Sequence, residues 1–141
     1  MRLILILLLL VSTVSTYAKS GDVTEYSLQN GLKIFVKEDH RAPIAISQVW
    51  YKVGSSYEST GTTGVSHALE HMMFRGTKKY GPGKLDKIIA ANGGQHNAFT
   101  SNDYTVYLEK LSTDKLPIAF ELEADRMQGA LLEEELFAKE K

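Results

Sequence analysis

One cluster in this chain, His67, Glu70 and His71, has the residue types and the spacing that metal-dependent hydrolysis requires. Residues three and four positions apart lie on one face of an α-helix, so the three side chains converge. Two imidazoles one turn apart can bind a single Zn²⁺, and a neighbouring carboxylate that is not a ligand can take a proton from the attacking water. The alternative is a helix with two solvent-facing histidines and an incidental glutamate. A loop before the helix and an apolar opposite face favour the metal site.

The composition excludes several other chemistries and partners. With 141 residues, 43% of them hydrophobic and 23% charged, the chain has room for one ordinary domain. Sixteen basic and seventeen acidic residues give a net charge of -1, which disfavours nucleic acid as a partner. The chain has no cysteine, so disulfides, a thiol nucleophile and cysteine-bound metals are excluded. Histidine, aspartate and glutamate remain as the metal ligands.

Residues 1–18 have the pattern of a signal peptide. A basic start precedes nine apolar residues, 3–11, and the small residues Thr16 and Ala18 favour cleavage after Ala18. The apolar run is too short to span a membrane, which needs about 20 residues, and without cysteine no lipid anchor can form. We therefore expect export, to a bacterial periplasm, with no stable membrane anchor after cleavage. The alternative for the apolar run is a buried first strand.

Hydrophobic periodicity predicts an α+β fold for residues 19–141, with helices packed on one side of an antiparallel sheet. Alternation between residues 23 and 53 predicts three antiparallel strands. The Asn30-Gly31 pair favours a two-residue type I′ hairpin between the first two of them. Two later strands are expected at 95–100 and 105–111.

Three helices are expected to accompany these strands. The helix that carries the histidine motif is predicted over about 64–75, with Gly76 as its C-terminal cap. A shorter helix stops at 92–94, and a third begins after a cap at Ser112 or Thr113. The mainly apolar face of the third helix is predicted to comprise Leu116, Ala119, Phe120, Glu123, Ala124 and Met127.

The motif His67-x-x-Glu70-His71 is the inverted zinc-binding motif, and three further blocks follow it, at 72–77, 93–100 and 122–127. Together they resemble the N-terminal domain of the pitrilysin, insulin-degrading enzyme and mitochondrial processing peptidase family. The resemblance covers nearly all of residues 23–141. It implies that His67 and His71 are zinc ligands and that Glu70 is the general base. The implied function is that of a zinc metalloendopeptidase acting on peptides or small unfolded proteins.

The resemblance also assigns roles outside the motif. It implies that Asn97, Ala98, Phe99 and Thr100 form an edge strand that binds substrate by strand addition, whereas the residues alone favour an ordinary interior strand. The family's third zinc ligand would fall near position 147, so the resemblance implies a partial N-terminal peptidase domain, truncated before that ligand. Glu140 matches an acidic residue that orients a ligand. The alternative for Glu140 is a solvated charge in an acidic helix.

Partners follow from the same resemblance. A peptide substrate is expected, together with an oligomer formed with a second copy or with another family member. The alternative function is a non-catalytic binding subunit, because some family members lose the motif and serve only as partners of an active chain. The 141-residue chain on its own is expected to be inactive. His96 is not expected to be a ligand, because the period of a strand turns it away from Asn97.

Overall fold

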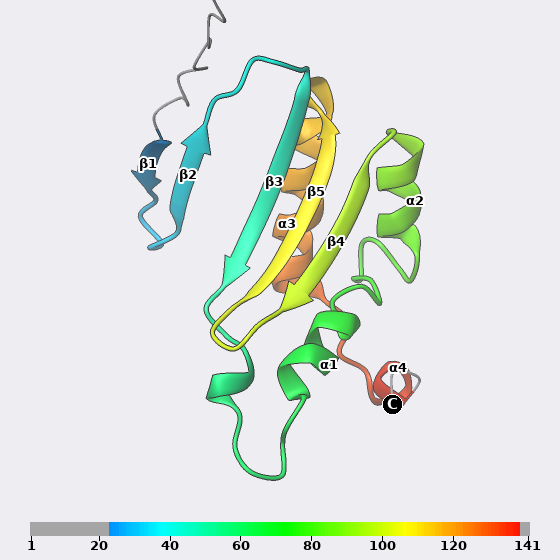
Figure 1. Ribbon diagram of the computed structural model, residues 1–141. Coiled ribbons are helices and arrows are strands. Elements are labelled where there is room, and N and C mark those ends of the chain that lie inside the picture. The colour runs from blue at the N-terminus through cyan, green and yellow to red at the C-terminus, as the bar shows by residue number, and fades with distance from the viewer. Residues whose placement is uncertain (1–22, 139–141) are drawn as a thin grey trace, which may run out of the picture. The chain divides into compact units, whose positions relative to one another are not determined.

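The computed structural model describes residues 23–138 and divides the chain into two compact units between Ala42 and Pro43 (Figure 1). The predicted signal peptide lies outside the described residues. The first unit holds β1 (Val23–Ser27) and β2 (Lys33–Lys37). The second holds β3 (Ile44–Tyr51), α1 (Val65–Met72), α2 (Lys84–Ala91), β4 (Gln95–Thr100), β5 (Thr105–Ser112), α3 (Leu116–Gly129) and α4 (Glu134–Ala138). None of the helices in this described part is long and apolar enough to cross a membrane.

The antiparallel hairpin of β1 and β2 turns differently from the prediction. The Leu28 N–H donates to the Leu32 carbonyl at 2.9 Å and the Gly31 N–H donates to the Leu28 carbonyl at 3.0 Å, so three residues connect the paired ends. A type I′ turn needs positive φ at both central residues, and in this turn Gly31 alone has it, at 87°. The predicted two-residue turn was wrong because Gly31 takes the left-handed position of a longer loop.

The second unit contains an antiparallel sheet in the order β3-β5-β4. The sequence predicted the strands themselves but not that β3 pairs along its whole length with β5. Within the described residues β4 pairs with β5 alone and therefore lies at an edge of the sheet (Figure 1). Its free edge is the place where a further strand could be added.

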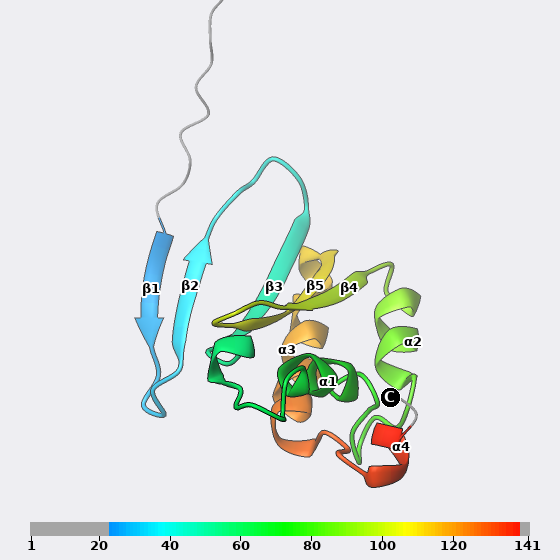
Figure 2. The same ribbon diagram turned by 60° about the horizontal axis from the view of Figure 1, so that its bottom comes forward.

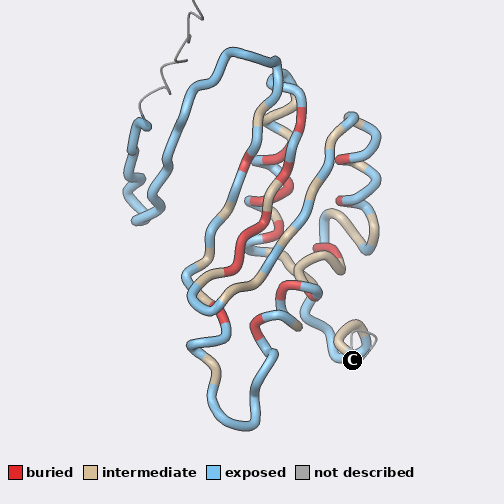
Figure 3. The backbone as a smooth tube through the Cα atoms, in the orientation of Figure 1, coloured by how far each residue is buried: buried red, intermediate tan, exposed pale blue. Residues whose placement is uncertain are grey.

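Helices cover one face of this sheet, as expected for the α+β class. α3 packs against β3 and β5, while α1 and α2 pack against β4 (Figure 2). In β4 the less exposed side chains alternate with exposed ones, which identifies the covered face. Figure 3 shows buried positions concentrated along β5 and on the helix surfaces that meet the sheet. The core cluster comprises Leu85, Ile89, Leu111, Ala119 and Leu122.

The buried face of α3 matches the prediction only in part, because Ala119 and Glu123 are buried as expected and Leu116 packs against the core cluster. Phe120 and Met127 are 57% and 43% exposed, whereas the side chains that face the sheet are Ala119, Leu122, Glu123 and Arg126. The helix also begins after a 3-10 turn, and neither Ser112 nor Thr113 caps it with its side chain. The apolar pattern missed Arg126, which is buried in an ion pair with Glu123.

Arg126 is the centre of a buried charged cluster between α3 and β5. It forms an ion pair with Glu123, its Nη2 lies 3.3 Å from Oε1 of Glu109, and all three side chains are at most 4% exposed. Its guanidinium also lies 4.2 Å from the ring centre of Tyr107 and 5.2 Å from that of Phe74. One cation cannot neutralise two buried carboxylates. Burial and then the neighbouring Glu123 raise the pKa of Glu109 from 4.5 to about 9.

We expect the free energy of unfolding to fall as the pH rises from about 4.5 to about 9. In that range native Glu109 keeps a proton that the unfolded chain releases, so raising the pH favours unfolding. In the variant Glu109→Gln, this contribution to the pH dependence of the free energy of unfolding should disappear, because the amide is neutral at every pH in the range. Urea unfolding across the range measures the effect, with the exposed Glu134→Gln as the matched control. Equal slopes for Glu109→Gln and the wild-type protein would refute the buried proton.

Candidate metal centre

The helix that carries the histidine motif is anchored at its N-terminus by Glu58. The carboxylate of Glu58 accepts hydrogen bonds from the N–H groups of Gly64, at 2.7 Å, and Ser66, at 2.9 Å. These N–H groups have no partner inside the helix, so Glu58 satisfies donors that would otherwise face solvent. The two backbone hydrogen bonds lower the pKa of Glu58. Sequence reasoning missed this residue because it lies in the loop, six positions before the helix cap.

His67 and His71 converge as the sequence predicted. Their Nε2 atoms lie 3.2 Å apart, and their rings meet edge to face with centres separated by 4.7 Å. Two nitrogens bound to one tetrahedral zinc at ordinary bond lengths are separated by about 3.3 Å. Both side chains are at the exposed surface of α1, where an ion and a water molecule could reach them. The donor set and its spacing therefore fit a zinc ion.

Glu70 points from the same helix toward the sheet. It is 8% exposed, and one of its carboxylate oxygens, Oε2, accepts a hydrogen bond from the hydroxyl of Thr100 on β4. The general-base candidate is therefore held between α1 and the edge strand. This side-chain contact is a second finding that the sequence did not predict.

α1 ends at Met72, which is earlier than predicted, and Gly76 has another role than capping it. Gly76 has φ 100°, and a Cβ there would lie 2.6 Å from the carbonyl oxygen of Tyr80. The next residue, Thr77, donates its hydroxyl proton to Asp125 on α3 and pairs with Ala130 beyond that helix. The segment after the motif is thus tied to α3.

The four residues of the predicted edge strand, Asn97 to Thr100, do lie in β4. Ala98 and Thr100 face the helices, while Asn97 and Phe99 are more exposed. The neighbouring His96 lies 3.1 Å from Asp86 on α2, measured from Nε2 to Oδ1, and its ring contacts Phe74. His96 therefore lies opposite Asn97, on the same face of β4 as Ala98 and Thr100, and its side chain contacts α2.

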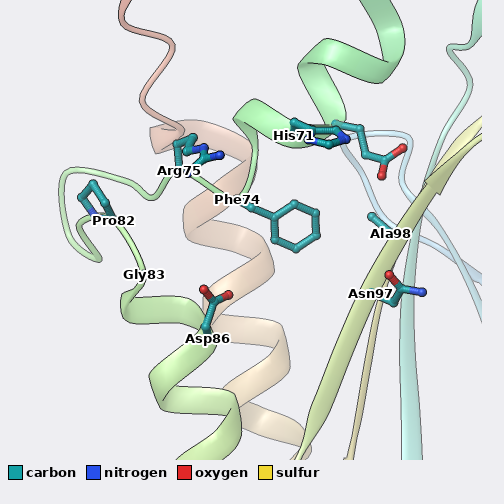
Figure 4. A pocket seen from close by; sticks show the side chains of 9 residues that line it. His71, Phe74, Arg75, Pro82, Gly83, Asp86, Asn97 and Ala98 are labelled. Carbon is teal, nitrogen blue, oxygen red and sulfur yellow. The ribbon is translucent and has the colours of Figure 1, made fainter. Parts of the chain in front are cut away.

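Two cavities flank Glu70 where β4 passes α1. A cavity of about 430 Å³ lies on the His71 side, between α1, α2 and β4 (Figure 4). It is lined by Glu70, His71, Phe74, Arg75, Pro82, Gly83, Asp86, Asn97 and Ala98. A second cavity, of about 480 Å³, lies on the His67 side and reaches the loop before α1. Both are lined by Glu70 and Ala98, so the candidate centre lies between two spaces along one strand.

Within residues 23–138, no group of three histidine, aspartate or glutamate side chains is placed to hold a metal ion. The two imidazoles of α1 thus form an incomplete set among the residues that the structure describes. Glu140, the predicted orienting residue, lies outside the described residues.

The scaffold and the motif together define an α+β domain with an inverted zinc-binding motif. An antiparallel sheet is covered by helices, one of which presents His-x-x-Glu-His beside an edge strand. The family profile described as Insulinase (Peptidase family M16) matches residues 33–141. The chain belongs to this family.

Curated relatives agree with the family assignment. The zinc protease PqqE of Helicobacter pylori is 39% identical over 116 residues, which is 82% of this chain and 26% of that protein. The beta subunit of the mitochondrial-processing peptidase of Dictyostelium discoideum is 34% identical over 128 residues, 89% of this chain and 27% of that subunit. Subunit 1 of the mitochondrial cytochrome b-c1 complex of Rattus norvegicus is 36% identical over 114 residues, 81% of this chain and 24% of that subunit.

A solved structure confirms the fold. The crystal structure of a protease from Helicobacter pylori superposes with a TM-score of 0.81 at 37% identity, covering 85% of this chain and 29% of that protein. The chain thus spans about a quarter of the length of the curated relatives it matches.

Proposed function

We propose that this chain is the N-terminal part of a zinc metalloendopeptidase that hydrolyses peptides or small unfolded proteins. The observation that carries the proposal is the 3.2 Å separation of the Nε2 atoms of His67 and His71, with Glu70 on the same helix. The separation fits two ligands of one zinc ion. The names of relatives such as the zinc protease of Helicobacter pylori support the same function.

In the proposed reaction, His67 and His71 bind the metal and Glu70 transfers the proton. Zinc held by His67 and His71 would polarise the scissile carbonyl and acidify the attacking water. Glu70 accepts the proton of that water as general base and returns it to the leaving nitrogen. Because Glu70 is nearly buried and held by Thr100, its carboxylate is pre-positioned for both transfers. We propose that a third protein ligand comes from outside residues 23–138.

β4 supports the proposed mode of substrate binding. Its free edge in the described part of the chain offers backbone N–H and C=O groups to an extended peptide. Asn97, Ala98, Phe99 and Thr100 would supply these groups, which gives affinity with little demand on sequence. The two cavities on either side of Glu70 would receive the side chains that flank the scissile bond.

The wider context is proposed from the sequence. Residues 1–18 as a signal peptide and residues 19–141 as part of the peptidase domain would place the protein outside the cytoplasm, in a bacterial periplasm. Relatives whose names describe subunits favour an oligomer with a second copy or another family member.

A second candidate function is that of a non-catalytic partner subunit. It is favoured by the 36% identity to subunit 1 of a cytochrome b-c1 complex, whose name mentions no peptidase. The presence of His67, Glu70 and His71 together opposes it, because a binding subunit does not need them.

Zinc content and peptide hydrolysis, measured on one preparation of the full-length protein, separate the two functions. We expect the wild-type protein to hold zinc and to lose activity on chelation. His67→Ala should lose both the metal and the activity, since one imidazole remains of two. His40→Ala, at an exposed turn, is the matched control and should retain both. A protein that holds no zinc, or that hydrolyses peptides after its removal, would contradict the proposal.

A further inference from the structure

Thr100 occupies the last position of the edge strand, where its backbone and its side chain face different partners. Its backbone belongs to the ladder with β5, opposite Thr105. Its side chain turns to the covered face, and the hydroxyl donates to Oε2 of Glu70 on α1. This contact joins residues 30 positions apart and connects β4 with the helix that carries the motif. The proposed substrate role of the strand uses the backbone alone, so the hydroxyl is left for another task.

The hydroxyl of Thr105 is a second possible partner of the Thr100 hydroxyl, and it does not change the direction of the Thr100 hydrogen bond. Thr105 Oγ1 lies 3.0 Å from the carbonyl oxygen of Val53 and 3.3 Å from Thr100 Oγ1. If Thr105 donates to Thr100, the proton of Thr100 remains for Glu70. If Thr105 donates to Val53, Thr100 can donate either to the neutral hydroxyl of Thr105 or to the carboxylate of Glu70. The charged acceptor forms the stronger hydrogen bond. In both arrangements Thr100 donates to Glu70.

Burial gives this hydrogen bond a directional role. Glu70 is 8% exposed and Thr105 is 3% exposed, so the hydrogen bond lies in a largely buried place between α1 and β4. A carboxylate oxygen that loses its donor at such a place loses a favourable interaction. The bond therefore fixes one oxygen of Glu70 against the sheet. A long glutamate side chain without this anchor has several rotamers available.

We propose that Thr100 is a positioning residue that orients the general base Glu70, in addition to its place in the substrate strand. The inference rests on the proposed function. Thr100 touches neither substrate nor metal through its hydroxyl, and acts through Glu70. The edge strand thereby couples substrate binding with catalysis. Thr100 is the last residue of the strand that is proposed to bind the peptide, and its hydroxyl orients Glu70.

The test compares Thr100→Val and Thr100→Ser in the full-length protein. Valine keeps the shape and strand preference of threonine without the hydroxyl, and serine keeps the hydroxyl. We expect Thr100→Val to lower kcat on the order of 10- to 100-fold, with KM and zinc content unchanged, since a misplaced catalytic group has an effect of this size. Thr100→Ser should restore kcat to within a few-fold of the wild-type value. Thr113→Val, an exposed threonine at the other end of β5, is the matched control.

Two measurements separate this role from substrate binding and from the proposed function itself. In a Glu70→Gln background, Thr100→Val should cause no further loss of the residual activity, because the residue it orients is already disabled. Crystal structures should show Glu70 leaving β4 in Thr100→Val and remaining in Thr100→Ser, a result that does not depend on hydrolysis. The proposal fails if Thr100→Val raises KM and leaves kcat unchanged, or if Thr100→Ser does not restore kcat. It also fails if the activity losses of Thr100→Val and Glu70→Gln multiply in the double variant, or if Glu70 keeps its position in the Thr100→Val structure. The wild-type protein could also prove inactive while the crystal structures of Thr100→Val and Thr100→Ser show Glu70 where we expect it. That result would refute the proposed function and would still establish that Thr100 positions Glu70.

Discussion

Glu70→Gln in the full-length protein should retain zinc and lose peptide hydrolysis by about 10³-fold or more. Removal of a general base typically costs two to four orders of magnitude in rate. Glu70 is turned toward Thr100 and the sheet, while the Nε2 atoms of His67 and His71 approach each other to 3.2 Å without it. Glutamine keeps the size of the side chain, and its carbonyl oxygen can still accept a hydrogen bond from the hydroxyl of Thr100, so the fold should persist.

Metal content and turnover must be measured on the same preparation for this prediction to be decisive. Glu135→Gln, an exposed glutamate on α4, is the matched control and should behave as the wild-type protein does. If zinc falls to background together with activity in Glu70→Gln, then Glu70 is a ligand and its assignment as the base is wrong. If activity survives with zinc bound, another group takes the proton.

Local patterns predicted the elements well, whereas contacts between distant segments were beyond them. The alternation at 95–100 and 105–111 and the helical spacing around His67 identify elements from neighbouring residues alone. The partner of β3 is β5, which lies about 60 positions further along the chain. Turn residues predict pairing only between consecutive strands, so they could not predict this pair. The hidden face of α3 was predicted only in part for the same reason. Glu123 was expected on that face, but Arg126 looks solvent-exposed in the sequence until Glu109 is placed beside it.

The candidate centre shows the same division. The spacing of His67, Glu70 and His71 on one helix determines that the two imidazoles meet, so this part followed from the sequence. The period of β4 shows that Thr100 and Asn97 face opposite sides, but not which side α1 covers. Only the packing of α1 on β4 identifies Thr100 as the partner of Glu70. The support from Glu58 depends on the path of a loop, which carries no periodic signal.

Residues 19–141 produced alone should bind zinc weakly and should not cleave peptides detectably. The described residues bring two imidazoles together and no third histidine or carboxylate into the same group, whereas a catalytic zinc normally has three protein ligands. The sheet face away from the helices also carries large apolar side chains that are 41% to 60% exposed: Ile44, Ile46, Trp50 and Phe99. We therefore expect marginal stability or aggregation as well.

A zinc titration of the purified residues 19–141, with a parallel assay on a quenched fluorescent peptide, tests this expectation. His71→Ala in the same residues is the control, because it removes one of the two imidazoles and sets the background for both measurements. Tight zinc binding, or hydrolysis well above that control, would show that the third ligand comes from within these residues. Glu140, which lies outside the described residues, would then be the first side chain to replace. The loss of zinc in Glu140→Gln would make it a ligand, whereas unchanged zinc with slower turnover would support the orienting role that the resemblance implies.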